Sequence, residues 1–240
     1  MLTLRGVLFA SLTFVSLCFG SATMARADTI TLNAVDSGHY FEDGFHIAAN
    51  ESYAAASPSV IFGARNFFVF DFSGVAPGTI TSATLRLFNP PGGYMSPNAS
   101  EVYTVFDVIT PIPTLVATHP DFNSEGGRIY QDLGAGAVYG ATTVSGANNN
   151  SVVSFSLNAT FLSGLNSNAG GLFAIGGSLT PDTPSLFSRV IFLGSGAPQH
   201  TRQLVLETTA VPEPATMLLL GTSLVGIAVE VRRRHKERSA

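Results

Sequence analysis

The sequence contains no tryptophan, a single cysteine and a single lysine. Cys18 lies within the first 27 residues and Lys236 within the last thirty. The segment between these ends can therefore form no disulfide and no cysteine-based metal site. Because binding to phosphates requires clustered positive charge, the lack of lysine also argues against a nucleic-acid partner.

The first 27 residues have the organisation of a secretory signal peptide. Arg5 supplies the positive charge, residues 7–19 are mostly apolar, and Ala25 and Ala27 form a small-x-small cleavage site. We expect a signal-peptide helix here and cleavage after Ala27. A retained N-terminal anchor is the alternative, but thirteen mostly apolar residues are few for a membrane span.

The last thirty residues also fall into three parts. The triplet Pro212, Glu213 and Pro214 precedes an apolar run over 215–229, and a basic tail follows. Fifteen helical residues measure about 22 Å, which is less than the ~30 Å of a bilayer core, so the sequence predicts a marginal C-terminal transmembrane helix. The prolines keep the triplet extended and accessible, because they lack backbone donors.

The basic tail fixes the expected orientation of this helix. Arg232, Arg233 and Arg234 form its first cluster, and such basic flanks stay on the cytoplasmic side. A Pro-Glu-Pro triplet, an apolar run and a basic end, in this order at the C-terminus, resemble the PEP-CTERM sorting signal of Gram-negative bacteria that produce exopolysaccharide. A permanent C-terminal anchor is the alternative interpretation.

The resemblance implies a partner and a destination. It implies processing by exosortase, a membrane protease-transpeptidase, of a precursor anchored in the inner membrane. The mature protein is then expected on the outer cell surface or in the extracellular matrix. The chain therefore divides into a signal peptide (1–27), a body (28–210) and a sorting and anchor segment (211–240).

The body carries its own charge balance. Its 183 residues include thirteen acidic residues against five arginines, so its net charge is −8. This length is sufficient for one domain with a proper core. This acidic balance again excludes a nucleic-acid binder. The function classes that remain are those of a protein at the cell surface, where the sorting signal is expected to deliver it.

Apolar residues in the body recur with the period of β-strands. In residues 65–72, Phe68, Phe70 and Phe72 face one side while Phe67 and Val69 face the other, which predicts a central strand buried on both faces. Residues 81–88 alternate more simply and predict a strand with one buried face. Further strands are expected at 29–35, 102–109, 138–144, 152–157, 171–176, 186–193 and 202–208.

Turn signals separate these runs, and one segment predicts a helix. Asn158 is a plausible N-cap for residues 158–165, in which Phe161 and Leu165 share a side. Many short strands with glycine- and proline-rich turns indicate an all-β fold. We expect a single antiparallel β-sandwich, jelly-roll-like, with one short helix.

A second resemblance concerns the body. Residues 64–87 include R-N-F-F-V-F-D-F-S and I-T-S-A-T-L-R-L, which resemble a segment of the DNRLRE/disaggregatase-related β-sandwich modules. The resemblance implies a jelly roll, and some of these modules are classed as carbohydrate-binding. The later helical segment departs from the family, since Phe161 or Leu165 stands where the family usually has tryptophan.

The densest polar cluster lies in residues 36–46. Asp36, Glu42 and Asp43 offer hard oxygen ligands for Ca²⁺, and Tyr40 could stack against a sugar ring. An ordinary solvated loop between two strands is the alternative, and a glycosidase pair of Asp36 with Glu42 or Asp43 is another. Apart from this calcium option, no cofactor or metal site is expected.

Other catalytic motifs are missing from the sequence, so we expect the protein not to be an enzyme. The body's histidines show no H-x-x-x-H spacing, and there is no nucleophile elbow or P-loop. Three functions remain: a non-enzymatic surface or matrix protein that associates with exopolysaccharide or biofilm, a purely structural surface protein, and a carbohydrate-active enzyme. An aromatic platform would use Tyr40, Tyr94 or Tyr103, unless these side chains only complete the core.

Overall fold

Antiparallel strands dominate the structure. The computed structural model describes residues 28–57, 63–76, 80–120, 124–167, 170–181, 187–197, 199–209, 221–224, 226–227, 232, 234–235 and 237. Its strands are β1 (Thr29–Asn33), β2 (Asp36–Phe41), β3 (Ala55–Ala56), β4 (Ala64–Asp71), β5 (Ile80–Asn89), β6 (Ser100–Asp107), β7 (Val138–Ser145), β8 (Ser151–Ser156), β9 (Leu172–Thr180), β10 (Val190–Ile191) and β11 (Arg202–Thr208). Its labelled helices are α2 (Ile112–Leu115), α3 (Ser124–Asp132), the 3-10 helix η1 (Gly146–Asn148) and α4 (Ala159–Ser167).

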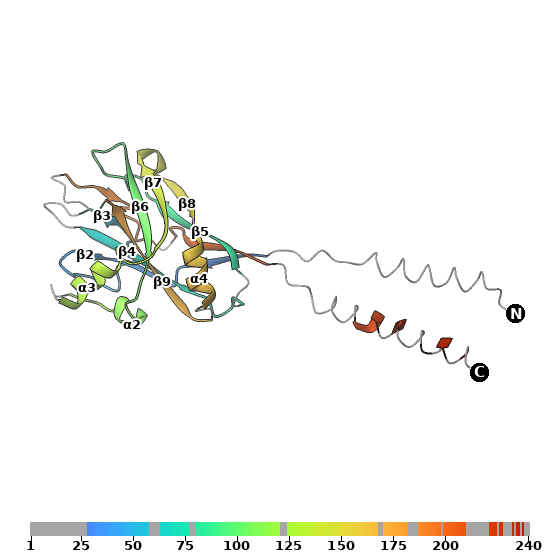
Figure 1. Cartoon of the computed structure of the whole chain (residues 1–240). Helices are drawn as coiled ribbons and strands as arrows, with labels where there is room; N and C mark the ends of the chain where they lie inside the picture. The colour runs from blue at the N-terminus through green and yellow to red at the C-terminus, as the bar shows by residue number, and fades with distance from the viewer. Residues whose placement is uncertain are drawn as a thin grey trace. The chain divides into compact units, whose positions relative to one another are not determined.

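The strands form two sheets (Figure 1). The smaller has the order β1-β11-β5-β8, and the larger the order β10-β3-β4-β9-β6-β7, with β2 also paired to β4. The strand pairs are antiparallel throughout. The structure is mostly β and its sheets are antiparallel, which confirms this part of the expected fold class. These sheets lie within one compact unit, Thr29–Thr208.

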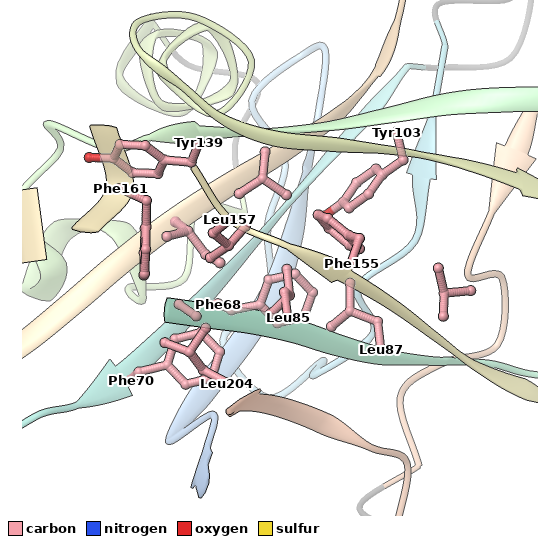
Figure 2. Packing of buried hydrophobic residues seen from close by; sticks show 14 of the residues in the cluster. Phe68, Phe70, Leu85, Leu87, Tyr103, Tyr139, Phe155, Leu157, Phe161 and Leu204 are labelled. Atoms are coloured by element: carbon pink, nitrogen blue, oxygen red, sulfur yellow. The ribbon is translucent and has the colours of Figure 1, made fainter. Parts of the chain in front are cut away.

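A large apolar cluster takes side chains from both sheets. Figure 2 shows Phe68 and Phe70 of β4 near Leu85 of β5 and Leu204 of β11, and all four are fully buried. The alternation expected for residues 81–88 is confirmed, because Leu85 and Leu87 are buried while Thr84 and Arg86 are more exposed. Burying a large apolar side chain contributes about 1.5–3 kcal/mol.

Strand β4 is buried on both faces, as its sequence predicts. Every residue of this strand except the last is buried. Phe68 and Phe70 belong to the cluster between the sheets, whereas Phe67 and Val69 belong to a second cluster that includes residues of α2 and α3. One strand therefore joins two apolar layers.

Helix α4 follows the expectation for residues 158–165. The Asn158 side-chain oxygen accepts a hydrogen bond from the backbone N–H of Phe161 at 3.1 Å, as an N-cap does. Phe161 and Leu165 are both fully buried in the main cluster. The ring of Phe161 meets that of Tyr139 edge-to-face, with centroids 5.3 Å apart.

Two glycines of β9 allow close packing on its two sides. A Cβ on Gly176 would lie 2.7 Å from the backbone oxygen of Leu133, just after α3. A Cβ on Gly177 would lie 2.1 Å from the hydroxyl of Tyr103, which donates a 2.8 Å hydrogen bond to Asn66. The glycines in this strand thus leave room for neighbouring groups.

Three sequence predictions need correction. The sequence predicts one short helix at 158–165, but helices α2 and α3 also occur, and α3 includes Gly126 and Gly127. Residues 36–41 form a strand rather than part of a loop. The strand expected over 186–193 is reduced, in its described part, to Val190–Ile191.

The terminal segments belong to a second unit, Met1–Asp28 with Thr209–Ala240. Residues 221–224 and several residues up to 237 are helical and mostly exposed. No helix in the described ranges combines the length and the hydrophobicity that a membrane crossing requires. The expected signal-peptide helix, and most of the expected transmembrane helix, lie outside the described residues.

The two adjacent glycines of α3 should respond oppositely to alanine. A Cβ on Gly126 would lie 2.1 Å from the backbone oxygen of Gly44, whereas a Cβ on Gly127 would meet nothing within 4 Å. Gly126→Ala should lower the free energy of unfolding by about 1–3 kcal/mol, because the helix must move away from the 41–45 turn. Gly127→Ala should raise it by about 0.5–1 kcal/mol, because alanine favours a helix.

Urea unfolding of residues 28–210 measures both changes, and each variant serves as the other's control. Equal effects of the two substitutions would show that Gly126 is chosen for backbone freedom and not for its contact with Gly44.

Candidate functional site

The side chain of Tyr40 is part of the core and does not offer an exposed aromatic surface for a sugar ring. Its side chain is fully buried, and its hydroxyl donates a 2.7 Å hydrogen bond to the backbone oxygen of Leu115 at the end of α2. Its ring stacks on His46 with centroids 4.4 Å apart. Tyr103 is also fully buried. The prediction that these two tyrosines bind a sugar face is therefore wrong, and Tyr94 alone of the three is partly exposed.

The acidic residues of the predicted calcium loop are held apart. Asp36 begins β2, whereas Glu42 and Asp43 follow its end. Five strand steps alone span about 17 Å, so Asp36 cannot share a cation with the other two. The same distance rules out the suggested glycosidase pairs, whose carboxyl groups are at most about 9.5 Å apart. Among the described residues, no group of three His, Cys, Asp or Glu side chains is placed so that it could hold a metal ion.

Asp43 and Asp36 each have a local structural role. The Asp43 carboxylate accepts a 3.0 Å hydrogen bond from the backbone N–H of Phe45 in the turn after β2. Asp36 lies near Glu51 and Arg202, two charged residues from later parts of the chain. Burial, together with the charge of Glu51, raises the pKa of Asp36, although the Ser37 backbone and Arg202 oppose this shift.

Three histidines that are scattered in the sequence come together beside β2. The backbones of His46 and His119 pair through hydrogen bonds of 2.9 and 2.8 Å, and His46 Nδ1 lies 3.0 Å from the backbone oxygen of His39. Burial lowers the pKa of His39, and it lowers the pKa of His46 to about 4, with further repulsion from the other two imidazoles. These imidazoles of His39 and His46 are neutral near pH 7.

A buried ion pair joins β6 to the segment before β10. Arg189 Nε donates hydrogen bonds of 3.0 Å to both carboxylate oxygens of Glu101, and only 2% of the Glu101 side-chain surface is exposed. Ser96 and Asn98 also donate to this carboxylate. Burial raises the pKa of Glu101, but these hydrogen bonds outweigh it, and the resulting pKa is below the ordinary value.

A cavity of about 220 Å³ lies beside this ion pair. It is lined by His39, Phe41, Ser52, Ala54, Ala56, Ser57, Ala64, Ser188, Arg189, Val190 and Leu193. The sequence gives little sign of this cavity, because its walls come from strands and loops that are distant in the chain. The run of three alanines and a serine at 54–57 is its one visible signal, since small side chains leave space next to a strand.

The sorting residues lie largely beyond the described part of the chain. Pro212, Glu213 and Pro214, the cleavage-site residues Ala25 and Ala27, and Arg233 all fall outside it. Arg232 and Arg234 are described, and both are helical and exposed.

Comparison with known families supplies the class of the protein. Residues 210–234 match the PEP-CTERM protein-sorting motif. The match confirms the sorting signal that the Pro-Glu-Pro triplet predicts, and it supports a PEP-CTERM protein. Such a motif indicates an exported protein that is made as a membrane-anchored precursor and sorted by exosortase. No curated protein matches the chain.

Glu101 and Glu51 offer a matched test of the buried ion pair. Both carboxylates pair with an arginine, but the Glu51 side chain is 49% exposed. Glu101→Ala should lower the free energy of unfolding by about 3–5 kcal/mol, because it removes the carboxylate that neutralises the buried Arg189 charge. Glu51→Ala should cost about 0–1 kcal/mol, because solvent screens its pair. Denaturant unfolding of both variants of residues 28–210 compares them, and similar losses would contradict a special role for Glu101.

The pH dependence of stability tests the same pair independently. Because the folded-state pKa of Glu101 is lowered, its stabilisation is complete above the unfolded pKa and is lost as the pH falls through the folded pKa. The wild-type body should therefore lose stability on acidification below about pH 4.5 more steeply than Glu101→Gln. Parallel curves would show that this carboxylate does not respond to acid in that range.

Proposed function

We propose that the mature protein is a non-enzymatic protein of the outer cell surface or extracellular matrix that associates with exopolysaccharide. The PEP-CTERM motif at residues 210–234 is the observation that carries this proposal, because it directs the chain out of the cell. The bacteria in which such signals are expected export polysaccharide. A body that reaches this environment meets polysaccharide at high local concentration.

The proposed architecture of the body is a β-sandwich. Two antiparallel sheets contribute to one apolar cluster, with Phe70 and Leu204 as members from opposite sheets. Such sandwiches often bind glycans on a surface shaped by strands and loops, but the fold alone does not specify a ligand. The expected jelly-roll connection and the resemblance to DNRLRE-related modules belong to this proposal.

The charge of the body favours a neutral polysaccharide. Its net charge of −8 repels anionic polymers unless a divalent cation bridges the charges. The burial of Tyr40 and Tyr103 also argues against a broad aromatic platform. We therefore expect weak binding in a recess, without turnover of the glycan.

Processing at both ends is the first testable consequence. Export should remove residues 1–27, and exosortase should remove the basic tail that contains Arg232 and Arg234. Intact-mass analysis of the protein released from the native cell surface should detect neither segment. A mature species that retains the basic tail would contradict sorting by exosortase, although not export.

Association with polysaccharide is the second consequence. Affinity electrophoresis of residues 28–210 through the host's purified exopolysaccharide should show retarded migration, and the reducing ends of the polymer should not increase. Unchanged migration with and without calcium would favour the purely structural protein. Released reducing ends would instead indicate a carbohydrate-active enzyme.

A further inference from the structure

One of the residues that line the cavity between β2 and the 54–57 segment has a polar side-chain atom without a partner in the described structure. The Ser57 hydroxyl is buried, with 1% of the residue exposed, and its Oγ makes no hydrogen bond. A buried hydroxyl without a hydrogen bond destabilises the fold. A ligand group in the cavity would satisfy it.

His39 presents a hydrogen-bond acceptor in the same cavity wall. Its Nδ1 lies 2.7 Å from the backbone oxygen of Ser52, and a carbonyl oxygen only accepts, so Nδ1 carries the proton. Since burial lowers the pKa of His39, the ring is neutral and Nε2 has a free lone pair. Such a nitrogen accepts a hydrogen bond from a ligand hydroxyl.

The other walls of the cavity are mostly apolar, and the one charged residue among them is paired. Phe41 meets the His39 ring edge-to-face at 4.8 Å, and Val190 and Leu193 complete an apolar side. The charge of Arg189 is neutralised by Glu101. The cavity therefore suits an uncharged molecule that has both hydroxyl groups and an apolar face.

The backbone beside the cavity is strained. Phe192, between the lining residues Val190 and Leu193, has a φ of 58°, which is unusual for a bulky residue. Its backbone N–H donates a 3.1 Å hydrogen bond to the Asn89 side chain, and its ring is fully buried. Strain held in place by surrounding contacts is concentrated at binding sites in proteins.

We infer that this cavity binds one uncharged sugar residue, of which one hydroxyl donates a hydrogen bond to His39 Nε2 and a second polar group forms a hydrogen bond with Ser57 Oγ. At about 220 Å³ the cavity is smaller than the ~300–1,000 Å³ of drug-sized pockets, so it fits a single ring and not an oligosaccharide. The C–H face of the ring would lie against Phe41, Val190 and Leu193. This inference rests on the proposed association with polysaccharide and identifies the unit that is recognised.

NMR titration of the full-length chain, purified in mild detergent, tests the inference. The probes are the methyl glycosides of glucose, galactose and mannose, with methyl glucuronide as the anionic counterpart. At least one neutral glycoside should shift the imidazole ¹⁵N resonance of His39 Nε2, with a Kd in the millimolar range. No shift with any neutral glycoside, or tighter binding of the glucuronide, would overturn the inference.

Variants separate binding from folding. Ser57→Ala should weaken the glycoside at least tenfold without lowering the melting temperature, because the hydroxyl that it removes has no partner. Ala56→Leu should fill the cavity and abolish binding. Ser82→Ala, at an exposed serine of β5, is the control and should leave the affinity unchanged. Full affinity in Ser57→Ala would place the glycoside elsewhere.

Electrophoresis of the same variants through exopolysaccharide distinguishes this inference from the proposed function. Retardation that is lost in Ser57→Ala supports both. Equal retardation of Ser57→Ala and the wild type overturns the cavity as the polysaccharide site while the proposed function stands. If the glycoside binds but the wild type is not retarded, the proposed association with polysaccharide fails and the cavity remains a sugar site.

Discussion

Burial of β4 on both faces is the constraint on which the rest of the structure depends. A strand with Phe68 and Phe70 on one side and Phe67 on the other cannot lie at a solvated surface without exposing large apolar area. The four-stranded sheet contributes to the cluster on one side, and α2 and α3 to the cluster on the other. On the α3 side the packing is close, because Gly126 of α3 lies against Gly44 and Gly176 of β9 lies against Leu133.

Most polar groups buried in this apolar framework form hydrogen bonds or ion pairs with one another. Asn66 receives a hydrogen bond from Tyr103 and donates one of 2.7 Å to the backbone oxygen of Tyr53. Glu101 and Arg189 neutralise each other. Against this background the unpaired Ser57 hydroxyl is unusual, since buried polar groups are nearly always satisfied. His46 Nε2 and Asn166 Oδ1 are also buried without a hydrogen bond, but of these three residues only Ser57 lines the cavity.

The sorting signal and the body carry separate kinds of information. The PEP-CTERM motif lies in residues 210–234, and the two sheets lie within Thr29–Thr208, so destination and molecular role are encoded in different segments. The proposed sugar site accordingly depends on the body alone. The body is acidic and contains no lysine, so it repels anionic ligands such as phosphate groups or an anionic polymer. It is therefore better suited to neutral ligands outside the cell.

The sequence alone determined the sorting motif, the antiparallel β class, the two-faced strand β4 and the N-cap of α4, because each depends on local order or on a short period. Tertiary structure alone decided the candidate site. Residues 36–46 contain closely spaced acids, but the extended strand β2 holds Asp36 away from Asp43. The cavity joins His39, Ser57 and Arg189, which are far apart along the chain. Side chains from distant segments meet only when strands pair and sheets pack, and no local pattern records that geometry.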